Sequence, residues 1–147
     1  MNSNKEEMDL TIVVPLFNEE ESLPELADWI SRVCKEAHLS YEVIFVDDGS
    51  NDNSWKVVEK LTKVNSSLKG IKFRRNYGKS AALNKGFEAA AGDVVITMDA
   101  DLQDPPEWIP KFLEWYQKGY DVVYAVRTRR KERPLKRLCY SVFYRLI

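Results

Sequence analysis

The sequence predicts an α/β fold with a mainly parallel sheet and helices on both faces. Five short apolar segments alternate with four segments whose apolar residues recur at helical spacing. The connections are short, and polar residues follow the first four strands. This alternation predicts parallel strands, because each strand must return through a helix to the end of the sheet where the previous strand began.

The strands are predicted from runs of Val, Ile, Leu and Phe that are too short for helices. We expect the first strand to end at Pro15, since proline cannot donate a hydrogen bond to a neighbouring strand. The last run precedes the basic end of the chain. The five predicted strands cover residues 10–14, 41–46, 69–73, 93–98 and 121–126.

The helices are predicted from periodicity and from residues that favour helix starts. Ser22 and Glu25 have the spacing of a capping box and are expected to begin the first helix. Asp52 or Asn53 is expected to begin the second. The third and fourth helices are predicted over 80–91 and 105–118, each followed by a glycine.

The composition is that of one folded domain. Of the 147 residues, 31% are charged and 44% are hydrophobic, which is typical of a globular chain with a substantial core. Cys34 and Cys139 form no C-x-x-C pair, and His38 is the single histidine. These counts argue against a zinc site or a disulfide framework and favour a reducing cytoplasm. We find no signal-peptide pattern and no apolar run near the roughly 20 residues of a membrane span.

The charge is divided unevenly along the chain. Residues 1–126 carry 14 Lys and Arg against 22 Asp and Glu, a net charge of −8. Residues 127–147 carry 8 Lys and Arg against one Glu, a net charge of +7. Such a change of sign indicates a different partner for the C-terminal part.

Asp99 and Asp101 stand directly after the apolar run at 94–98. If the chain stays extended there, side chains two residues apart leave on the same side, so the two carboxylates converge. Like charges that close repel each other unless a cation lies between them. Asp104 precedes two prolines and is the better candidate for capping the fourth helix, which leaves the other two acids without a structural role. Because the chain offers oxygen ligands here, the expected ion is Mg²⁺ or Mn²⁺.

Polar residues follow four strands, and in a parallel sheet these strand ends share one edge. The loop at 75–79 is basic, whereas those at 47–48 and 99–103 are acidic. This combination suits a metal-bound anion such as a nucleoside diphosphate. Neither G-x-G-x-x-G nor G-x-x-x-x-G-K-[ST] is present, which excludes dinucleotide and P-loop sites. A D-x-D phosphatase with Asp99 as its nucleophile stays open. A response regulator would need its acid pair after the first strand, whereas Asp47 and Asp48 follow the second.

Four stretches together resemble family 2 glycosyltransferases: VVPLFNE at 13–19, VDDGS at 46–50, RNYGKSAA at 75–82 and MDADLQDPPE at 98–107. The last two most resemble the branch with dolichyl-phosphate mannose synthase and bacterial polyprenyl-phosphate (bactoprenol) glucosyltransferases. The resemblance covers nearly the whole chain. It implies a GT-A fold with a Rossmann-like sheet, and inverting transfer of a sugar from a nucleotide donor. The sugar is expected to be a hexose such as glucose and the donor a UDP-sugar, with guanine left open as the alternative base.

The resemblance also implies roles for individual residues. Asp47 and Asp48 are implied in base and ribose recognition, and Gln103 joins Asp99 and Asp101 as a ligand of the metal that bridges the diphosphate. That ion would act as a Lewis acid on the leaving nucleoside diphosphate. Lys79 either assists there or is a solvated lysine at a helix start. The set implied to bind the nucleotide sugar is Pro15, Leu16, Asn18, Glu19, Asp47, Asp48, Lys79, Asp99, Ala100 and Asp101.

The kind of acceptor is inferred from the acidic residues in the C-terminal part of the sequence. A hydroxyl acceptor needs a general base, but after Asp121 the single acid is Glu132, within a basic cluster. A polyprenyl phosphate is already an anion and needs cations to position it. The resemblance implies Arg127 as a catalytic residue beside Asp99 and Asp101, with Arg137 and Ser141 as weaker matches to phosphate-binding positions. The alternatives are a saccharide hydroxyl acceptor in surface polysaccharide synthesis and a binding module without turnover.

From residue 134 the sequence has an amphipathic helical pattern. Such a helix either lies in the interface of an anionic membrane or packs on the core, and the basic charge favours the membrane. We therefore expect a catalytic domain over 1–126 and a membrane-proximal segment over 127–147. This segment is expected to be truncated inside its helix, so it stays open whether the chain is active alone. The expected location is the cytoplasmic, inner face of the membrane. No nucleic-acid partner is expected, and a homo-oligomer is left open.

Overall fold

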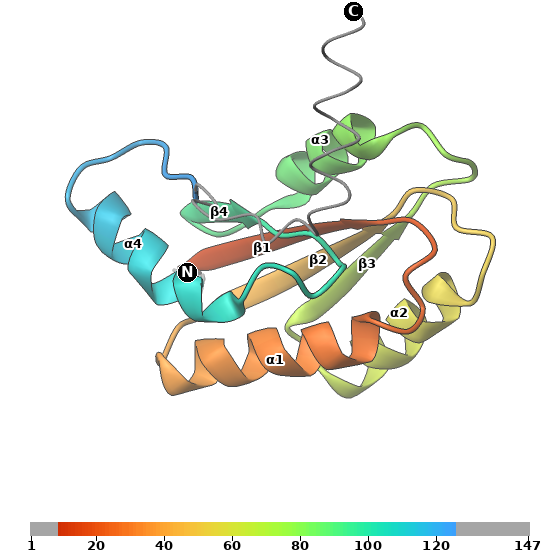
Figure 1. Cartoon of the computed structure of the whole chain (residues 1–147), viewed down its shortest axis with the longest axis horizontal. Helices are drawn as coiled ribbons and strands as arrows, with labels where there is room; N and C mark the ends of the chain where they lie inside the picture. Colours follow the sequence, from red (N-terminus) through yellow and green to blue (C-terminus); the bar gives the residue numbers. More distant parts are fainter. Residues whose placement is uncertain (1–8, 126–147) are drawn as a thin grey trace, which may run out of the picture.

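The structure is a computed structural model that describes residues 9–125 (Figure 1). Four parallel strands form one sheet in the order β3-β2-β1-β4, so the first strand in sequence lies at an interior position. The predicted parallel sheet is confirmed. The strands are β1 (Leu10–Leu16), β2 (Tyr41–Asp47), β3 (Leu68–Lys72) and β4 (Val94–Thr97).

Helices cover both faces of this sheet, as predicted. α1 (Leu23–Glu36) and α2 (Ser54–Val64) lie side by side on one face, and α3 (Lys79–Ala89) lies on the other (Figure 1). A 3₁₀ turn, η1 (Pro106–Trp108), and α4 (Ile109–Gln117) follow β4 and contact α1. Within residues 9–125 no helix combines the length and hydrophobicity that crossing a membrane requires.

Two apolar clusters hold the layers together. The larger contains Ile30, Phe45 and Ile109 and lies between the sheet and α1, α2 and α4. The smaller contains Val13 and Ile44 and lies under α3. α3 approaches β1 closely because its residue 86 is glycine: a Cβ there would lie 2.2 Å from Val13 Cγ1. The sheet is thus buried on both faces along its interior strands.

The register of the sheet places four strand ends at one edge. Leu16 pairs with Asp47 and Asp47 with Lys72, so β1, β2 and β3 end at the same level. β4 ends earlier, because Thr97 pairs with Val13. The segment after β4 therefore continues alongside the end of β1, and the Met98 N–H donates to the Val13 carbonyl at 3.1 Å.

A buried polar network lies on the α3 face of the sheet, remote from that edge. Glu42 is 1% exposed and accepts hydrogen bonds from the Thr11 hydroxyl at 2.7 Å and the Ala91 N–H at 2.8 Å. Its second oxygen forms an ion pair with Lys69. Burial alone would raise the pKa of Glu42, but these donors favour the carboxylate and hold its pKa below the ordinary value of 4.5. The network fixes the loop between α3 and β4.

β1 does not end at Pro15, as the sequence suggested, but continues to Leu16. The Val13 carbonyl faces β4, and backbone groups alternate along a strand, so the Pro15 nitrogen faces the same side. At that level β4 has already ended. The missing N–H of Pro15 therefore costs no ladder hydrogen bond, and the strand passes through it.

The predicted fifth strand is wrong over its described residues, 121–125, which form no strand. Val122 and Tyr124 are 78% and 79% exposed. Their β propensity is high, but a strand also needs a ladder partner, and no described strand pairs with this segment. The segment instead borders a groove of about 1200 Å³ along β4, which Trp108 and Tyr116 also line.

One predicted helix cap is confirmed in its position but not in its hydrogen bonds, and another is wrong. Ser22 is the N-cap of α1, as predicted, but its hydroxyl donates back to the carbonyl and carboxylate of Glu19, so no capping box with Glu25 forms. Asp104 lies one residue before the N-cap of η1, which is Pro105. The predicted helix 105–118 begins as a 3₁₀ turn because Pro110 cannot donate the α-helical hydrogen bond. The predicted start of α2 is confirmed, with Asn53 as its N-cap.

Candidate functional site

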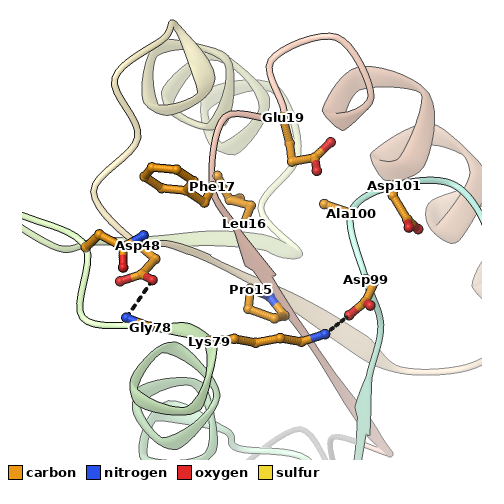
Figure 2. A pocket seen from close by; sticks show the side chains of 11 residues that line it. Pro15, Leu16, Phe17, Glu19, Asp48, Gly78, Lys79, Asp99, Ala100 and Asp101 are labelled. Atoms are coloured by element: carbon orange, nitrogen blue, oxygen red, sulfur yellow. Dashed lines mark hydrogen bonds and ion pairs between the residues drawn. The ribbon is translucent and has the colours of Figure 1, made fainter. Parts of the chain in front are cut away.

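A cavity of about 300 Å³ lies at the carboxyl edge of the sheet, where the loops after β1, β2, β3 and β4 meet (Figure 2). Eight of its lining residues belong to the set implied by the sequence resemblance, so residues far apart in the sequence are brought together as expected. These eight are Pro15, Leu16, Glu19, Asp48, Lys79, Asp99, Ala100 and Asp101.

The loop after β1 is hydrogen-bonded to the loop after β2. Asn18 adopts a left-handed backbone conformation (φ 57°), accepts from the Asn51 N–H at 2.8 Å and donates its own N–H to the Ser50 hydroxyl at 2.9 Å. The Glu19 N–H donates to the Ser54 hydroxyl at 2.8 Å. Asn18 thus joins the two loops and does not line the cavity. Its implied contact with the nucleotide sugar stays a prediction.

The loop after β2 is in turn joined to the loop after β3. Asp48 is 4% exposed, and its two carboxylate oxygens accept from the N–H groups of Tyr77, at 2.7 Å, and Gly78, at 2.9 Å. Gly49 has a φ of 75°, and a Cβ on it would lie 2.4 Å from the Arg75 carbonyl carbon. Asp48, which Figure 2 shows bonded to Gly78, and the close approach at Gly49 therefore fix the position of the loop that leads to Lys79.

Asp47 lies outside the cavity lining and is fully buried. One of its carboxylate oxygens accepts from the Ser50 N–H at 2.8 Å, and the other has no hydrogen-bond partner in the described part of the chain. A buried oxygen without a donor is costly, so it marks a place where a donor would be stabilising. The role implied for Asp47 in base recognition stays a prediction.

The acids after β4 reach the cavity through a turn. The chain turns at Ala100 and Asp101, Leu102 has a φ of 60°, and one Asp101 oxygen accepts from the Gln103 N–H at 3.1 Å. The expectation that an extended chain carries both acids is therefore wrong. Asp99 and Asp101 nevertheless both line the cavity (Figure 2), because the turn is anchored by the buried side chain of Ala100.

Lys79 reaches across the cavity to Asp99. Its Nζ lies 2.6 Å from the Asp99 Oδ1, joining the first residue of α3 to the first acid of the turn (Figure 2). The side chains are 59% and 47% exposed. Lys79 thus lines the cavity while much of its side chain stays in contact with solvent, so its implied role at the diphosphate stays a prediction.

The donor set suits a cation that takes its remaining ligands from a diphosphate. Within residues 9–125 no three His, Cys, Asp or Glu side chains gather closely enough to hold a metal by themselves. Mg²⁺ in particular is often bound by only one or two carboxylates together with substrate phosphates and water. Asp99 and Asp101 fit that role. Gln103 lines the groove along β4 and not the cavity, so its part as a ligand stays a prediction.

Three lining residues, Phe17, Asn76 and Gly78, were not in the implied set. Asn76 and Gly78 belong to the loop at 75–79, which the convergence of strand ends did bring to this edge, although the resemblance implied no binding role for them. Phe17 is 40% exposed and carries no polar group that would mark it in the sequence. Arg127, Arg137 and Ser141 lie outside the described residues.

The parallel sheet with helices on both faces, and the acidic turn at its carboxyl edge, define an α/β domain of the GT-A type. The chain belongs to glycosyl transferase family 2, whose sequence profile matches residues 11–138. The family that the four motifs suggested is therefore confirmed.

Curated relatives indicate the branch of this family. The chain is 47% identical over 129 residues to an undecaprenyl-phosphate 4-deoxy-4-formamido-L-arabinose transferase of Pseudomonas fluorescens (strain SBW25). The match covers 87% of this chain and 38% of the relative. It is 46% identical over 124 residues to the transferase of the same name from Aeromonas hydrophila, covering 84% and 38%. The chain thus spans about two fifths of the length of these relatives.

A solved structure supports the fold. The mannosyltransferase PcManGT of Pyrobaculum calidifontis, in complex with GDP-Man and Mn²⁺, superposes with a TM-score of 0.68 at 26% sequence identity. The match covers 94% of this chain and 39% of the mannosyltransferase.

Proposed function

We propose that this domain binds a nucleotide sugar and a divalent cation and, as part of a longer protein, transfers the sugar to a polyprenyl phosphate with inversion. The observation that carries the proposal is the cavity at the carboxyl edge of the sheet, where Asp99, Asp101 and Lys79 meet. Ligands of open α/β sheets bind at this edge. The names of the curated relatives support the same chemistry.

In the proposed complex the walls at Pro15 and Leu16 contact the nucleoside, with Glu19 and Asp48 at its polar groups. Asp99 and Asp101 hold Mg²⁺ or Mn²⁺, with Gln103 as a further candidate ligand. The bound ion would supply Lewis-acid neutralisation of the diphosphate. The volume of about 300 Å³ is at the lower end for a ligand site, which fits a domain that binds only part of the donor by itself.

The acceptor phosphate is already an anion, so its oxygen attacks the anomeric carbon without a general base. The bond from that carbon to the β-phosphate oxygen breaks, and the electron pair leaves with the nucleoside diphosphate. Arg127, Arg137 and Ser141 are proposed to position the acceptor phosphate. The net charge of +7 over residues 127–147 supports their placement at the anionic inner face of a membrane.

For the sugar we propose 4-deoxy-4-formamido-L-arabinose, from the names of the relatives. This is a pentose derivative, in place of the hexose that the motifs led us to expect. For the nucleotide we keep UDP, with GDP as the comparison because the mannosyltransferase was solved with GDP-Man.

Nucleotide binding is tested by calorimetry on the 147-residue chain, with UDP and GDP, each with and without Mn²⁺. We expect UDP to bind only with Mn²⁺, and Asp101→Asn to weaken this binding at least about tenfold, a loss of roughly 1.4 kcal/mol. Asp93→Asn removes an exposed acid at the start of β4, outside the cavity, and is the matched control. Equal affinities for the two variants would contradict the proposed metal site.

Transfer is tested with the full-length protein, undecaprenyl phosphate in detergent and UDP-sugars, with the lipid product identified by mass spectrometry. The expected product is a glycosyl undecaprenyl phosphate. Transfer to a saccharide hydroxyl instead would favour the polysaccharide alternative. Donor binding without transfer to any acceptor would favour the binding module.

A further inference from the structure

We infer that Lys79 is a built-in counter-cation that excludes a bare metal ion from Asp99 and moves to the diphosphate when metal and nucleotide bind together. The inference rests on the proposed function and adds to it a rule for how the two ligands bind. The Lys79 ammonium group occupies the place beside Asp99 that a metal ion would need.

The first step is the geometry of the pair. The Lys79 Nζ lies 2.6 Å from the Asp99 Oδ1. A divalent cation on that oxygen would bind at about 2.0–2.6 Å, depending on the ion. The ammonium and the metal would then share one oxygen and lie within a few ångströms of each other, where two cations repel strongly. Metal binding at this Asp99 oxygen therefore requires the Lys79 head group to leave.

The second step is that the head group can leave while its backbone stays in place. Asp48 accepts the Gly78 N–H, and the Gly78 carbonyl accepts the N–H groups of Ala81 and Ala82. The start of α3 is thus held by hydrogen bonds on both sides of Lys79. The side chain itself is 59% exposed, and its flexible four-carbon stem lets Nζ move to another part of the cavity.

The third step is the charge balance of the cavity. Among residues 9–125 its lining contains four carboxylates, those of Glu19, Asp48, Asp99 and Asp101, and one cationic side chain, Lys79. A metal ion that arrives alone displaces the ammonium from Asp99 and offers it no anion in return. A metal ion that arrives with a diphosphate brings new anionic oxygens, to which Lys79 can donate. The two ligands should therefore bind with positive coupling, and each must raise the affinity of the other by the same factor.

The ion pair is partly exposed, and such pairs contribute little to stability. Replacing Lys79 should therefore leave the fold intact. Lys79→Met removes the ammonium and keeps most of the stem. Lys85→Met is the matched control: Lys85 lies on the same helix, pairs with Glu88 and does not line the cavity. Lys79→Arg keeps the positive charge and tests whether charge is the property that matters.

The experiment measures Mn²⁺ affinity by electron paramagnetic resonance, without nucleotide and with saturating UDP, and UDP affinity at saturating Mn²⁺. For Lys79→Met we expect bare Mn²⁺ to bind about tenfold more tightly and UDP about tenfold more weakly, so that the coupling factor falls. Lys85→Met should change the Mn²⁺ affinity and the UDP affinity by less than about twofold each, and so leave their coupling unchanged. Lys79→Arg should bind bare Mn²⁺ as weakly as the wild type.

The inference predicts that Lys79→Met changes the two affinities in opposite directions: bare Mn²⁺ binds more tightly and UDP more weakly. If the wild type binds UDP with Mn²⁺ but Lys79→Met leaves bare Mn²⁺ binding unchanged or weaker, the inference is overturned and the proposed function stands. If the wild type binds no nucleotide with Mn²⁺, the proposed function fails and the inference fails with it.

Discussion

The carboxylate of Asp48 accepts the backbone N–H of Gly78 at 2.9 Å, joining the end of β2 to the start of α3. Because its other oxygen accepts the Tyr77 N–H, this one buried side chain fixes the loop that carries Lys79 into the cavity. The site is thus held together by hydrogen bonds between loops, and its residues can be tested one at a time.

Asp48→Asn is expected to destabilise the domain by about 1–3 kcal/mol, because an amide has one accepting oxygen and leaves one of the two N–H groups facing an NH₂ group. Urea unfolding measures this loss. UDP binding should weaken as well, since the loop loses its fixed position. If Asp48→Asn costs no more than Asp93→Asn, which removes an exposed acid outside the cavity, the fixing role of Asp48 is wrong.

Gly49→Ala should cost more stability than Gly119→Ala. Both residues have positive φ, 75° and 92°, so both substitutions carry the backbone strain of about 1 kcal/mol or more. A Cβ on Gly49 would also lie 2.4 Å from the Arg75 carbonyl carbon, whereas no described residue lies within 4 Å of a Cβ on Gly119. The difference between the two unfolding free energies measures this close contact. Equal losses would mean that the loops separate easily.

Gly86→Ala should destabilise the domain less in a Val13→Ala background than in the wild type. The added Cβ would lie 2.2 Å from Val13 Cγ1, and shortening Val13 removes that methyl group. A double-mutant cycle by urea unfolding isolates the interaction, which we expect at about 0.5–3 kcal/mol for residues in direct contact. Additive losses would show that α3 shifts away from β1 without cost.

Glu42 should make stability depend on acid pH. The pKa of this carboxyl is lower in the folded protein than its ordinary value of 4.5, so the unfolded state binds more protons in that range. The stabilisation is present above about pH 4.5 and is lost as the pH falls through the folded pKa. Glu42→Gln should therefore be less stable than the wild type near neutral pH and lose less stability as the pH falls below about 4.5. Parallel curves for the two proteins would rule out this contribution.

Much of this architecture was predictable because it depends on local pattern. The apolar runs and the polar residues that end them located the strands to within one or two residues, apart from the segment at 121–126. Chain order then required a shared carboxyl edge. The acids at Asp99 and Asp101, and Lys79 opposite them, could be assigned to one site for that reason alone.

The features that could not be predicted depend on what lies beside a residue in space. β1 passes through Pro15 because β4 has already ended at that level. Residues 121–125 have strand propensity but no described ladder partner. Asn18 is a polar residue of a type common in binding sites, yet its side chain joins two loops. In each case the outcome depends on a neighbour that the sequence does not identify.

The most direct test of the central claim is a crystal structure of the chain with UDP and Mn²⁺, in which anomalous scattering locates the manganese. We expect one manganese ion bound by carboxylate oxygens of Asp99 and Asp101 and by the diphosphate, with the Lys79 ammonium moved from Asp99 to a phosphate oxygen. Manganese elsewhere, or a diphosphate bound away from these two acids, would contradict it.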